Sequence, residues 1–274
     1  MGRTSSGLLR GETRRISRRR LVVGAGAAGT LAALGWAGVS AVTGDGDRPL
    51  ALVYRGPAAC SGCAEAVAAL LRSAPGEFRT EYCGPGEQRQ ISRSALAEAA
   101  VYAQPGGGNV GPAWRRLRDH AEDIRGFVRD GGHYLGFCLG AYLAAARPGF
   151  GLLDGKVDQY IRTAGASVDS ADDAVVPVRW RGRPRHMFFQ DGPTLELRPG
   201  TPGIVLATYD TGAPAAVVTA FGAGRVGLVG PHPEADRSWY ADAELTNPDG
   251  IRLDLGHDLV RSTVDGWAPA AGGS

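Results

Sequence analysis

Residues 131–142 read GGHYLGFCLGAY, and this stretch decides the fold. His133–Phe137 is a short apolar run typical of a buried strand, and 139–147 is predicted to be a helix. Between them lies Cys138, within a G-x-C-x-G string whose glycines permit a sharp strand-to-helix turn. Such a turn exposes the thiol at a helix N-terminus, where free N–H groups favour a thiolate and later an oxyanion. The alternative is a structural cysteine packed beneath the sheet, because free cysteine is commonly buried.

The segments before this stretch alternate between predicted strands and helices. An apolar run at 49–54 predicts a first strand, and a helix is expected at 64–72. Apolar residues from Trp114 to Val128 recur at spacings of three and four, which predicts one amphipathic helix. This alternation indicates an α/β fold with a central, mostly parallel sheet covered on both faces. Two further strands are expected at 78–82 and 99–103.

The second half of the chain is richer in β-structure. From residue 175 onward, short apolar runs are separated by Gly, Pro and Asp turns. A final amphipathic helix is expected within 251–264. The predicted strands of this half are 175–180, 187–189, 204–209, 215–220 and 225–229.

A histidine and a glutamate follow the last predicted strand, in the sequence Gly230-Pro-His-Pro-Glu234. This position places them near the same edge of the sheet as Cys138. His232 is then a candidate base that takes the thiol proton and returns it to the leaving group, and Glu234 is a candidate to orient the imidazole. A lone histidine in a loop is more often simply solvated. The joint occurrence with the Cys138 turn favours the catalytic interpretation.

Together these residues resemble the class I glutamine amidotransferase superfamily, whose fold is a flavodoxin-like three-layer α/β sandwich with a Cys-His-Glu triad. Residues 102–108 (YAQPGGG), 131–142 and 222–234 (GAGRVGLVGPHPE) are similar to the domain found at the N-terminus of some biotin-protein ligases, which also occurs alone in bacteria. The resemblance covers roughly residues 49–264. It implies that Cys138, His232 and Glu234 act as nucleophile, base and orienting residue.

The resemblance also implies an oxyanion hole. The backbone N–H of Leu139 would form it together with an N–H of the glycine loop, where Gly107 and Gly108 are the candidates. Residues 188–193 (FFQDGP) resemble a further turn of the family to which no role is assigned.

The reaction implied is attack of a thiolate on an amide or related acyl carbon, giving a thioester that water or an amine resolves. A small-molecule or peptide amide is the expected substrate. Neither a synthase domain nor a biotin-ligase catalytic domain is recognised in the sequence, so biotin transfer is not expected and glutamine is not favoured. Two alternatives stay open. One is a non-catalytic binding domain of the same fold that recognises a cell-envelope protein, and the other is a glutaminase subunit for a separate synthase.

The N-terminus resembles a twin-arginine export signal, because Ser17-Arg18-Arg19-Arg20 precedes the weakly hydrophobic segment 21–44. Val39-Ser40-Ala41 offers small residues for cleavage, and the alternative is an uncleaved anchor, since this uncharged segment is long enough to span a bilayer. We therefore expect export by the twin-arginine translocase to a secreted or cell-envelope location. The expected division is a signal and linker at 1–44, an amidotransferase-like domain at 45–267 and a disordered tail at 268–274.

The charge distribution argues against nucleic acid as a partner. Seven of the 30 basic residues and one of the 28 acidic residues precede residue 42, which leaves 23 basic and 27 acidic residues and a net charge of −4. A mildly acidic body with scattered basic residues lacks the positive patch that nucleic-acid binding requires.

Three cysteines beside Cys138 are candidates for a disulfide. Cys60, Cys63 and Cys83 allow three pairings, and an oxidising compartment favours a structural bond over a redox-active C-x-x-C motif. No metal site is expected, because no paired C-x-x-C or H-x-x-x-H motif supplies four zinc ligands. No cofactor is expected either.

Overall fold

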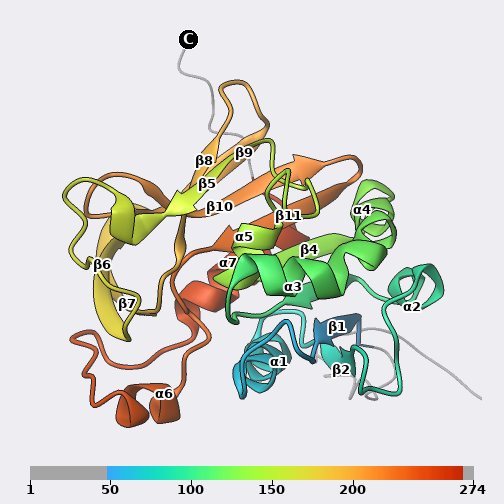
Figure 1. The fold of residues 1–274 in the computed structure, drawn as a ribbon, viewed down its shortest axis with the longest axis horizontal. Coiled ribbons are helices and arrows are strands. Elements are labelled where there is room, and N and C mark those ends of the chain that lie inside the picture. Colours follow the sequence, from blue (N-terminus) through green and yellow to red (C-terminus); the bar gives the residue numbers. More distant parts are fainter. Residues whose placement is uncertain (1–47, 268–274) are drawn as a thin grey trace, which may run out of the picture. The chain divides into compact units, whose positions relative to one another are not determined.

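The first strand shows how the chain builds its layers. In the computed structural model, which describes residues 48–267, β1 (Leu50–Tyr54) is buried along its whole length. Side chains alternate along a strand, so Leu50 and Leu52 enter one apolar cluster while Ala51 and Val53 enter another. The strand therefore has a packed layer on each face, as a three-layer α/β sandwich requires (Figure 1).

Nine strands of the described residues form one sheet, in the order β2-β1-β3-β4-β11-β10-β9-β6-β7. The pairs from β2 to β11 are parallel, and those from β11 to β7 are antiparallel. The α/β class is thus as predicted, but the mostly parallel sheet was wrong: half of the neighbouring pairs are antiparallel. The reason is that short turns, rather than helices, connect β6 to β7 and β10 to β11. A separate antiparallel ribbon pairs β5 with β8.

The strands after β1 have the following bounds: β2 (Arg79–Cys83), β3 (Val101–Gln104), β4 (His133–Phe137), β5 (Gly155–Gln159), β6 (Ala174–Trp180), β7 (Arg183–Phe189), β8 (Pro193–Leu197), β9 (Gly203–Tyr209), β10 (Pro214–Phe221) and β11 (Gly224–Val229).

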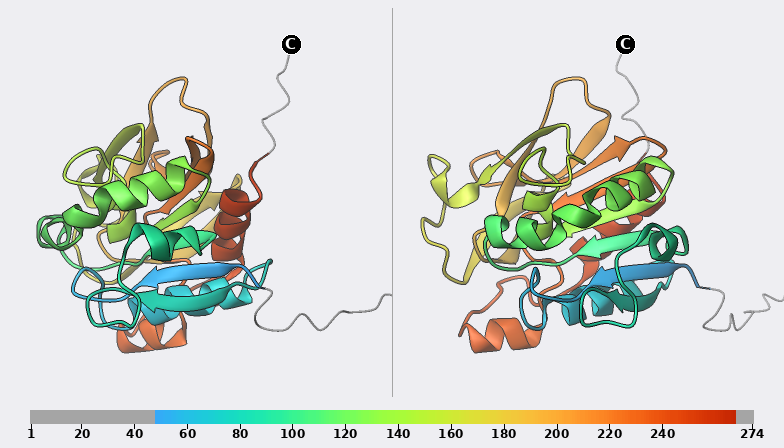
Figure 2. Two further views of the ribbon diagram at one scale, coloured as in Figure 1. Left: turned by 90° about the vertical axis from the view of Figure 1, so that its right-hand side faces the viewer. Right: turned by 45° about the vertical axis from the view of Figure 1, so that its right-hand side comes forward.

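Helices cover both faces of the sheet (Figure 2). On one face, α1 (Cys63–Ser73) and α7 (Asp254–Val264) pack against the sheet and each other through Leu70, Leu71 and Leu259. On the other face lie α3 (Val110–Leu117), α4 (Ala121–Arg129) and α5 (Leu139–Leu143). The remaining short helices are α2 (Arg93–Ala97), α6 (Arg237–Asp242), η2 (Arg118–His120) and η3 (Tyr160–Arg162).

Two predicted helices differ from those observed. The helix expected from Trp114 to Val128 is divided by the 3₁₀ turn η2, although Leu117, Ile124 and Val128 still share one buried layer. The helix expected at 139–147 ends at Leu143. Pro148 cannot donate to a helical ladder and disfavours helical geometry before it, and the backbone N–H of Phe150 instead donates to the Leu143 carbonyl at 2.6 Å.

The predicted signal at 1–44 and tail at 268–274 lie outside the described residues. Within residues 48–267, no helix is both long and apolar enough to cross a membrane.

Candidate active site

Cys138 occupies the turn between β4 and α5 in an unusual backbone conformation, with φ 46° and ψ −101°. Few non-glycine residues adopt a positive φ, and such strain is concentrated at functional sites. The flanking positions must be glycine because backbone atoms approach them closely. A Cβ on Gly136 would lie 2.6 Å from the carbonyl oxygen of Gly140, and a Cβ on Gly140 would lie 2.1 Å from the carbonyl oxygen of Gln104. The G-x-C-x-G string is therefore dictated by the turn itself.

His232 reaches the same edge of the sheet because of strand pairing. β11 lies beside β4 in parallel, with Val229 opposite Phe137, so the residues after both strands emerge together. The backbone N–H of Cys138 donates to the Val229 carbonyl at 2.9 Å, which ties the two chain segments at this point. A Cβ on Gly106 would lie 2.8 Å from Cε1 of His232 and 3.7 Å from Cβ of Cys138. The His232 imidazole and the Cys138 side chain thus border the same point of the glycine loop.

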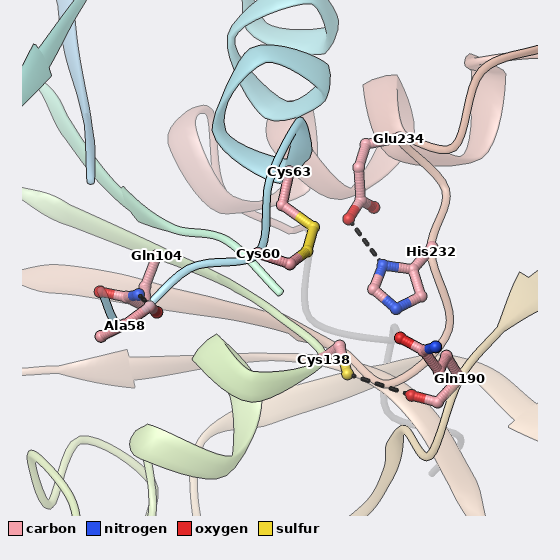
Figure 3. The surroundings of a disulfide bond; sticks show 8 residues. All are labelled: Ala58, Cys60, Cys63, Gln104, Cys138, Gln190, His232 and Glu234. Carbon is pink, nitrogen blue, oxygen red and sulfur yellow. Dashed lines mark hydrogen bonds and ion pairs between the residues drawn. A yellow bond between two sulfur atoms is a disulfide. The ribbon is translucent and has the colours of Figure 1, made fainter. Parts of the chain in front are cut away.

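Glu234 holds the imidazole. Its Oε1 lies 2.9 Å from Nδ1 of His232, and both side chains are almost completely buried (Figure 3). Nε2 of His232 has no hydrogen-bond partner among the described residues. Burial by itself lowers the pKa of His232, but the negative charge of Glu234, followed by that of Cys138, outweighs burial and raises it to about 10. The arrangement therefore favours a protonated imidazole beside the thiol.

The thiol of Cys138 points toward a loop that the sequence did not assign. Its Sγ donates to the backbone carbonyl of Gln190 at 3.4 Å, and only 6% of Cys138 is exposed. Gln190 belongs to the turn between β7 and β8. The backbone N–H of His232 donates to the carbonyl of Phe188 at 2.8 Å and so anchors this turn to the segment that carries His232. The 188–193 turn, noted in the sequence without a role, therefore forms one wall of the site.

A cavity of about 290 Å³ opens onto Cys138. The predicted oxyanion-hole residues Gly107, Gly108 and Leu139 all line it. Leu139 is the first residue of α5, so no carbonyl of that helix accepts its backbone N–H. A second cavity of about 560 Å³ shares Tyr142 and Gln159 with the first. The thiol of Cys138 thus faces a space large enough for a small organic molecule.

Another cavity, of about 430 Å³, lies at the opposite ends of the strands. It is lined by Phe127, His133 and the 130–132 turn. Burial, followed by the charge of Arg225, lowers the pKa of His133 to about 4. No cysteine lines this cavity, so the candidate site is the smaller space beside Cys138.

Of the disulfide candidates, Cys60 and Cys63 are bonded and Cys83 is a buried free thiol. The backbone N–H of Cys60 donates to the Gly106 carbonyl at 3.0 Å, which ties the disulfide to the glycine loop. Burial raises the pKa of Cys83 to about 12, which leaves it unreactive at neutral pH.

The structure holds no candidate metal centre within residues 48–267, because no three His, Cys, Asp or Glu side chains are grouped to bind an ion there. Two histidines outside the site have partners that the sequence did not reveal. Nδ1 of His186 lies 3.2 Å from a carboxylate oxygen of Asp249, and Nε2 of His257 lies 2.9 Å from the Ser73 hydroxyl.

Four residues that line the cavity were missed as site residues or left without a role: Tyr142, Gln159, Gln190 and Asp191. The Gln159 amide donates to both carboxylate oxygens of Asp191, at 3.1 and 3.0 Å, and the Tyr142 hydroxyl donates to the Asp191 carbonyl at 3.1 Å. The FFQDGP string was the one signal that could have indicated Gln190 and Asp191.

Part of the chain matches a known protein family. Residues 51–159, less than half of the chain, match the family described as "Biotin-protein ligase, N terminal". No curated protein matches the chain.

Several solved structures are similar to this chain, and the first of them supports the α/β fold. The structure of PurLQS from Thermotoga maritima is 17% identical with a TM-score of 0.53, over 80% of this chain and 98% of that one. A cytoplasmic protein from Salmonella typhimurium is 13% identical with a TM-score of 0.45, over 77% and 98% of the two chains. A β-galactosidase from Bacillus circulans is 15% identical with a TM-score of 0.40, over 67% of this chain and 28% of that one. The described chain thus has an α/β fold similar to that of the Thermotoga maritima structure, and its residues 51–159 match the biotin-protein ligase N-terminal family.

Proposed function

We propose that this protein is an exported, cysteine-dependent amide hydrolase or acyltransferase that acts through a thioester. The observation that carries the proposal is the strained Cys138 turn beside a buried histidine whose Nδ1 is held by Glu234 and whose Nε2 is unpartnered. A buried polar atom without a partner is costly, so its retention supports a role toward the thiol or a substrate.

The proposed reaction begins when Nε2 of His232 takes the proton of Cys138. Because the pKa of His232 is raised to about 10, the imidazole retains the proton that it takes from the thiol. The thiolate attacks the acyl carbon and forms a C–S bond, while the negative charge on the carbonyl oxygen is stabilised by the N–H of Leu139 and one from the glycine loop. Collapse expels the amine, which takes the proton from His232.

The thioester is then resolved by a second nucleophile. Water or an amine gives up a proton to His232 as it attacks the acyl carbon, and the Cys138 sulfur leaves with that proton. Water as the acceptor makes the protein a hydrolase, and an amine makes it an acyltransferase. The 290 Å³ cavity beside Cys138 offers space for either acceptor.

The test is the rate at which iodoacetamide alkylates Cys138 in the folded protein between about pH 5 and pH 9, with mass spectrometry to locate the label. Fast labelling well below the pKa of about 8.5 of a free thiol, slowed by His232→Ala, is the expected result. Incubation with p-nitrophenyl acetate should also leave an acetyl group on Cys138. Slow labelling at every pH, unaffected by His232→Ala, would instead support a non-catalytic binding domain.

Export by the twin-arginine pathway is part of the proposal. It is supported by the Ser17-Arg18-Arg19-Arg20 string and by the Cys60–Cys63 disulfide, since disulfides persist mainly in oxidising compartments.

A further inference from the structure

The cavity beside Cys138 carries a negative charge that the reaction outlined above does not use. Asp191 is the residue after Gln190, whose carbonyl accepts the Cys138 thiol, and it lines the same cavity. Asp191 therefore belongs to the wall that the β7–β8 turn forms beside the cavity onto which the thiol opens.

This carboxylate lacks a positively charged partner. Asp191 makes no ion pair with any residue of 48–267, and no Arg, Lys or His lines the cavity. Its contact is with the neutral amide of Gln159, which donates to both carboxylate oxygens. Each oxygen keeps a free lone pair, so the group can still accept hydrogen bonds from a ligand.

The backbone at Asp191 is held in a conformation that aspartate adopts only rarely. Its φ is 48°, and the hydroxyl of Tyr142 donates to its carbonyl at 3.1 Å. Burial, followed by the negative charge of Asp191, raises the pKa of Tyr142, so the hydroxyl keeps its proton and remains a donor. The side chains of Tyr142 and Gln159 thus hold Asp191 and its carboxylate in place, despite the unfavourable backbone angle.

We infer that the substrate carries a positive charge, an ammonium or guanidinium group, and that Asp191 is the residue that selects it. The inference rests on the proposed function, because it takes Cys138 to be the nucleophile that meets this substrate. A cation would supply the charge-assisted hydrogen bonds that the carboxylate lacks. The adjoining cavity beyond Tyr142 and Gln159 leaves room for the rest of a longer substrate.

Charged thiol reagents test this without knowledge of the substrate. The probes are three methanethiosulfonates: the 2-(trimethylammonium)ethyl reagent, the 2-sulfonatoethyl reagent and the neutral methyl reagent. In each, the Cys138 thiolate attacks the sulfenyl sulfur, a disulfide forms and methanesulfinate leaves. The full-length protein and Asp191→Asn are compared, with mass spectrometry to locate the label on Cys138.

We expect the cationic reagent to react faster than the anionic one in the unaltered protein, and Asp191→Asn to reduce this ratio roughly tenfold, as the loss of one nearby charge permits. The rate with the neutral reagent is the reference by which the two charged reagents are normalised in each protein. Asparagine tolerates the backbone angle, and Asp191→Gly, which favours it, should give the same ratio. Asp242→Asn, an exposed site at the end of α6, is the control and should leave the ratio unchanged.

The outcomes separate the two claims. If the neutral reagent labels Cys138 rapidly but both Asp191 variants keep the original ratio, the selection of cations is wrong and the cysteine chemistry stands. If even the neutral reagent fails to label Cys138, the proposed function is overturned and the inference falls with it.

Discussion

His232 and Glu234 are joined by a 2.9 Å contact between Nδ1 and Oε1 that is closed to solvent, since 4% and 1% of the two residues are exposed. Folding places the pair out of water, and the charge of Glu234 is what keeps the imidazole protonated there. Glu234 is thus as much a determinant of the charge of the site as His232 itself.

This pair predicts a specific dependence of stability on pH. The pKa of His232 rises from an ordinary 6.5 to about 10 on folding. A raised pKa contributes stability that is complete below pH 6.5 and is lost as pH rises through 10. The free energy of unfolding of the unaltered protein should therefore exceed that of Glu234→Gln at pH 6.5, and the gap should shrink toward pH 10. Urea denaturation of both proteins at four pH values measures this difference in unfolding free energy. A difference that does not change with pH would contradict the raised pKa of His232.

The backbone at Cys138 predicts a difference between two substitutions that both remove the thiol. Cys138→Ala keeps the strain of the positive φ, whereas Cys138→Gly relieves it. We expect the glycine variant to be more stable than the alanine variant by roughly 1 kcal/mol, after allowance for the greater entropy of unfolded glycine. Both should lose acyl transfer completely. Equal denaturation midpoints for the two variants would argue against strain at this turn.

Two glycines near the nucleophile should respond differently to alanine. In Gly106→Ala the new methyl group meets the His232 ring, and in Gly140→Ala it meets the backbone carbonyl of Gln104 at 2.1 Å. The first should fold and slow the alkylation of Cys138 at least tenfold, because the imidazole is displaced. The second should fail to fold or lose several kcal/mol. Circular dichroism and iodoacetamide labelling of both variants distinguish these effects, and rapid labelling of folded Gly106→Ala would be inconsistent with the site geometry.

The disulfide should contribute modestly to stability because its loop is short. Cys60 and Cys63 are three residues apart, for which loop-closure entropy gives about 2 kcal/mol. The double variant Cys60→Ser, Cys63→Ser should lower the unfolding free energy by about this amount. Dithiothreitol should have the same effect on the unaltered protein and none on the variant. If dithiothreitol lowered the unfolding free energy of the double variant as well, a disulfide other than Cys60–Cys63 would be responsible.

The export proposal is tested by a conservative change in the N-terminal segment. Replacing Arg18 and Arg19 by lysine keeps the charge and removes the arginine pair, so the protein should accumulate in the cytoplasm. The matched control replaces Arg14 and Arg15, which precede the motif, and should leave export intact. Immunoblots of cell fractions measure both, and export of the Arg18 and Arg19 variant at the normal level would rule out this pathway.

The sequence was most informative where a motif is local. The Cys138 turn requires glycines two residues on either side, and His232 and Glu234 are separated by one residue, so their patterns can be recognised without knowledge of the fold. Parallel pairing of β4 and β11 then brings the two motifs together. The pairing of Cys60 was left open among three options, because spacing alone does not show that Cys83 is directed into the core.

The rest of the site depends on contacts that no local pattern reveals. Gln159 and Asp191 are 32 residues apart and meet because β5 pairs with β8. The β5 sequence GKVDQ is mostly polar and half exposed, so it does not show the apolar alternation of a buried strand. The mostly parallel sheet was predicted from the first half of the chain, where the alternation of strands and helices is regular.

The residues of the site come from both halves of the mixed sheet. Cys138 and His232 follow strands of the parallel half, whereas Gln190 and Asp191 belong to a turn after β7, in the antiparallel half. Under the proposed function, we expect mutations in that turn to alter which molecules are accepted while Cys138 and His232 keep their positions. An experimenter who wishes to change the selectivity of this scaffold should therefore graft new residues into the β7–β8 turn first.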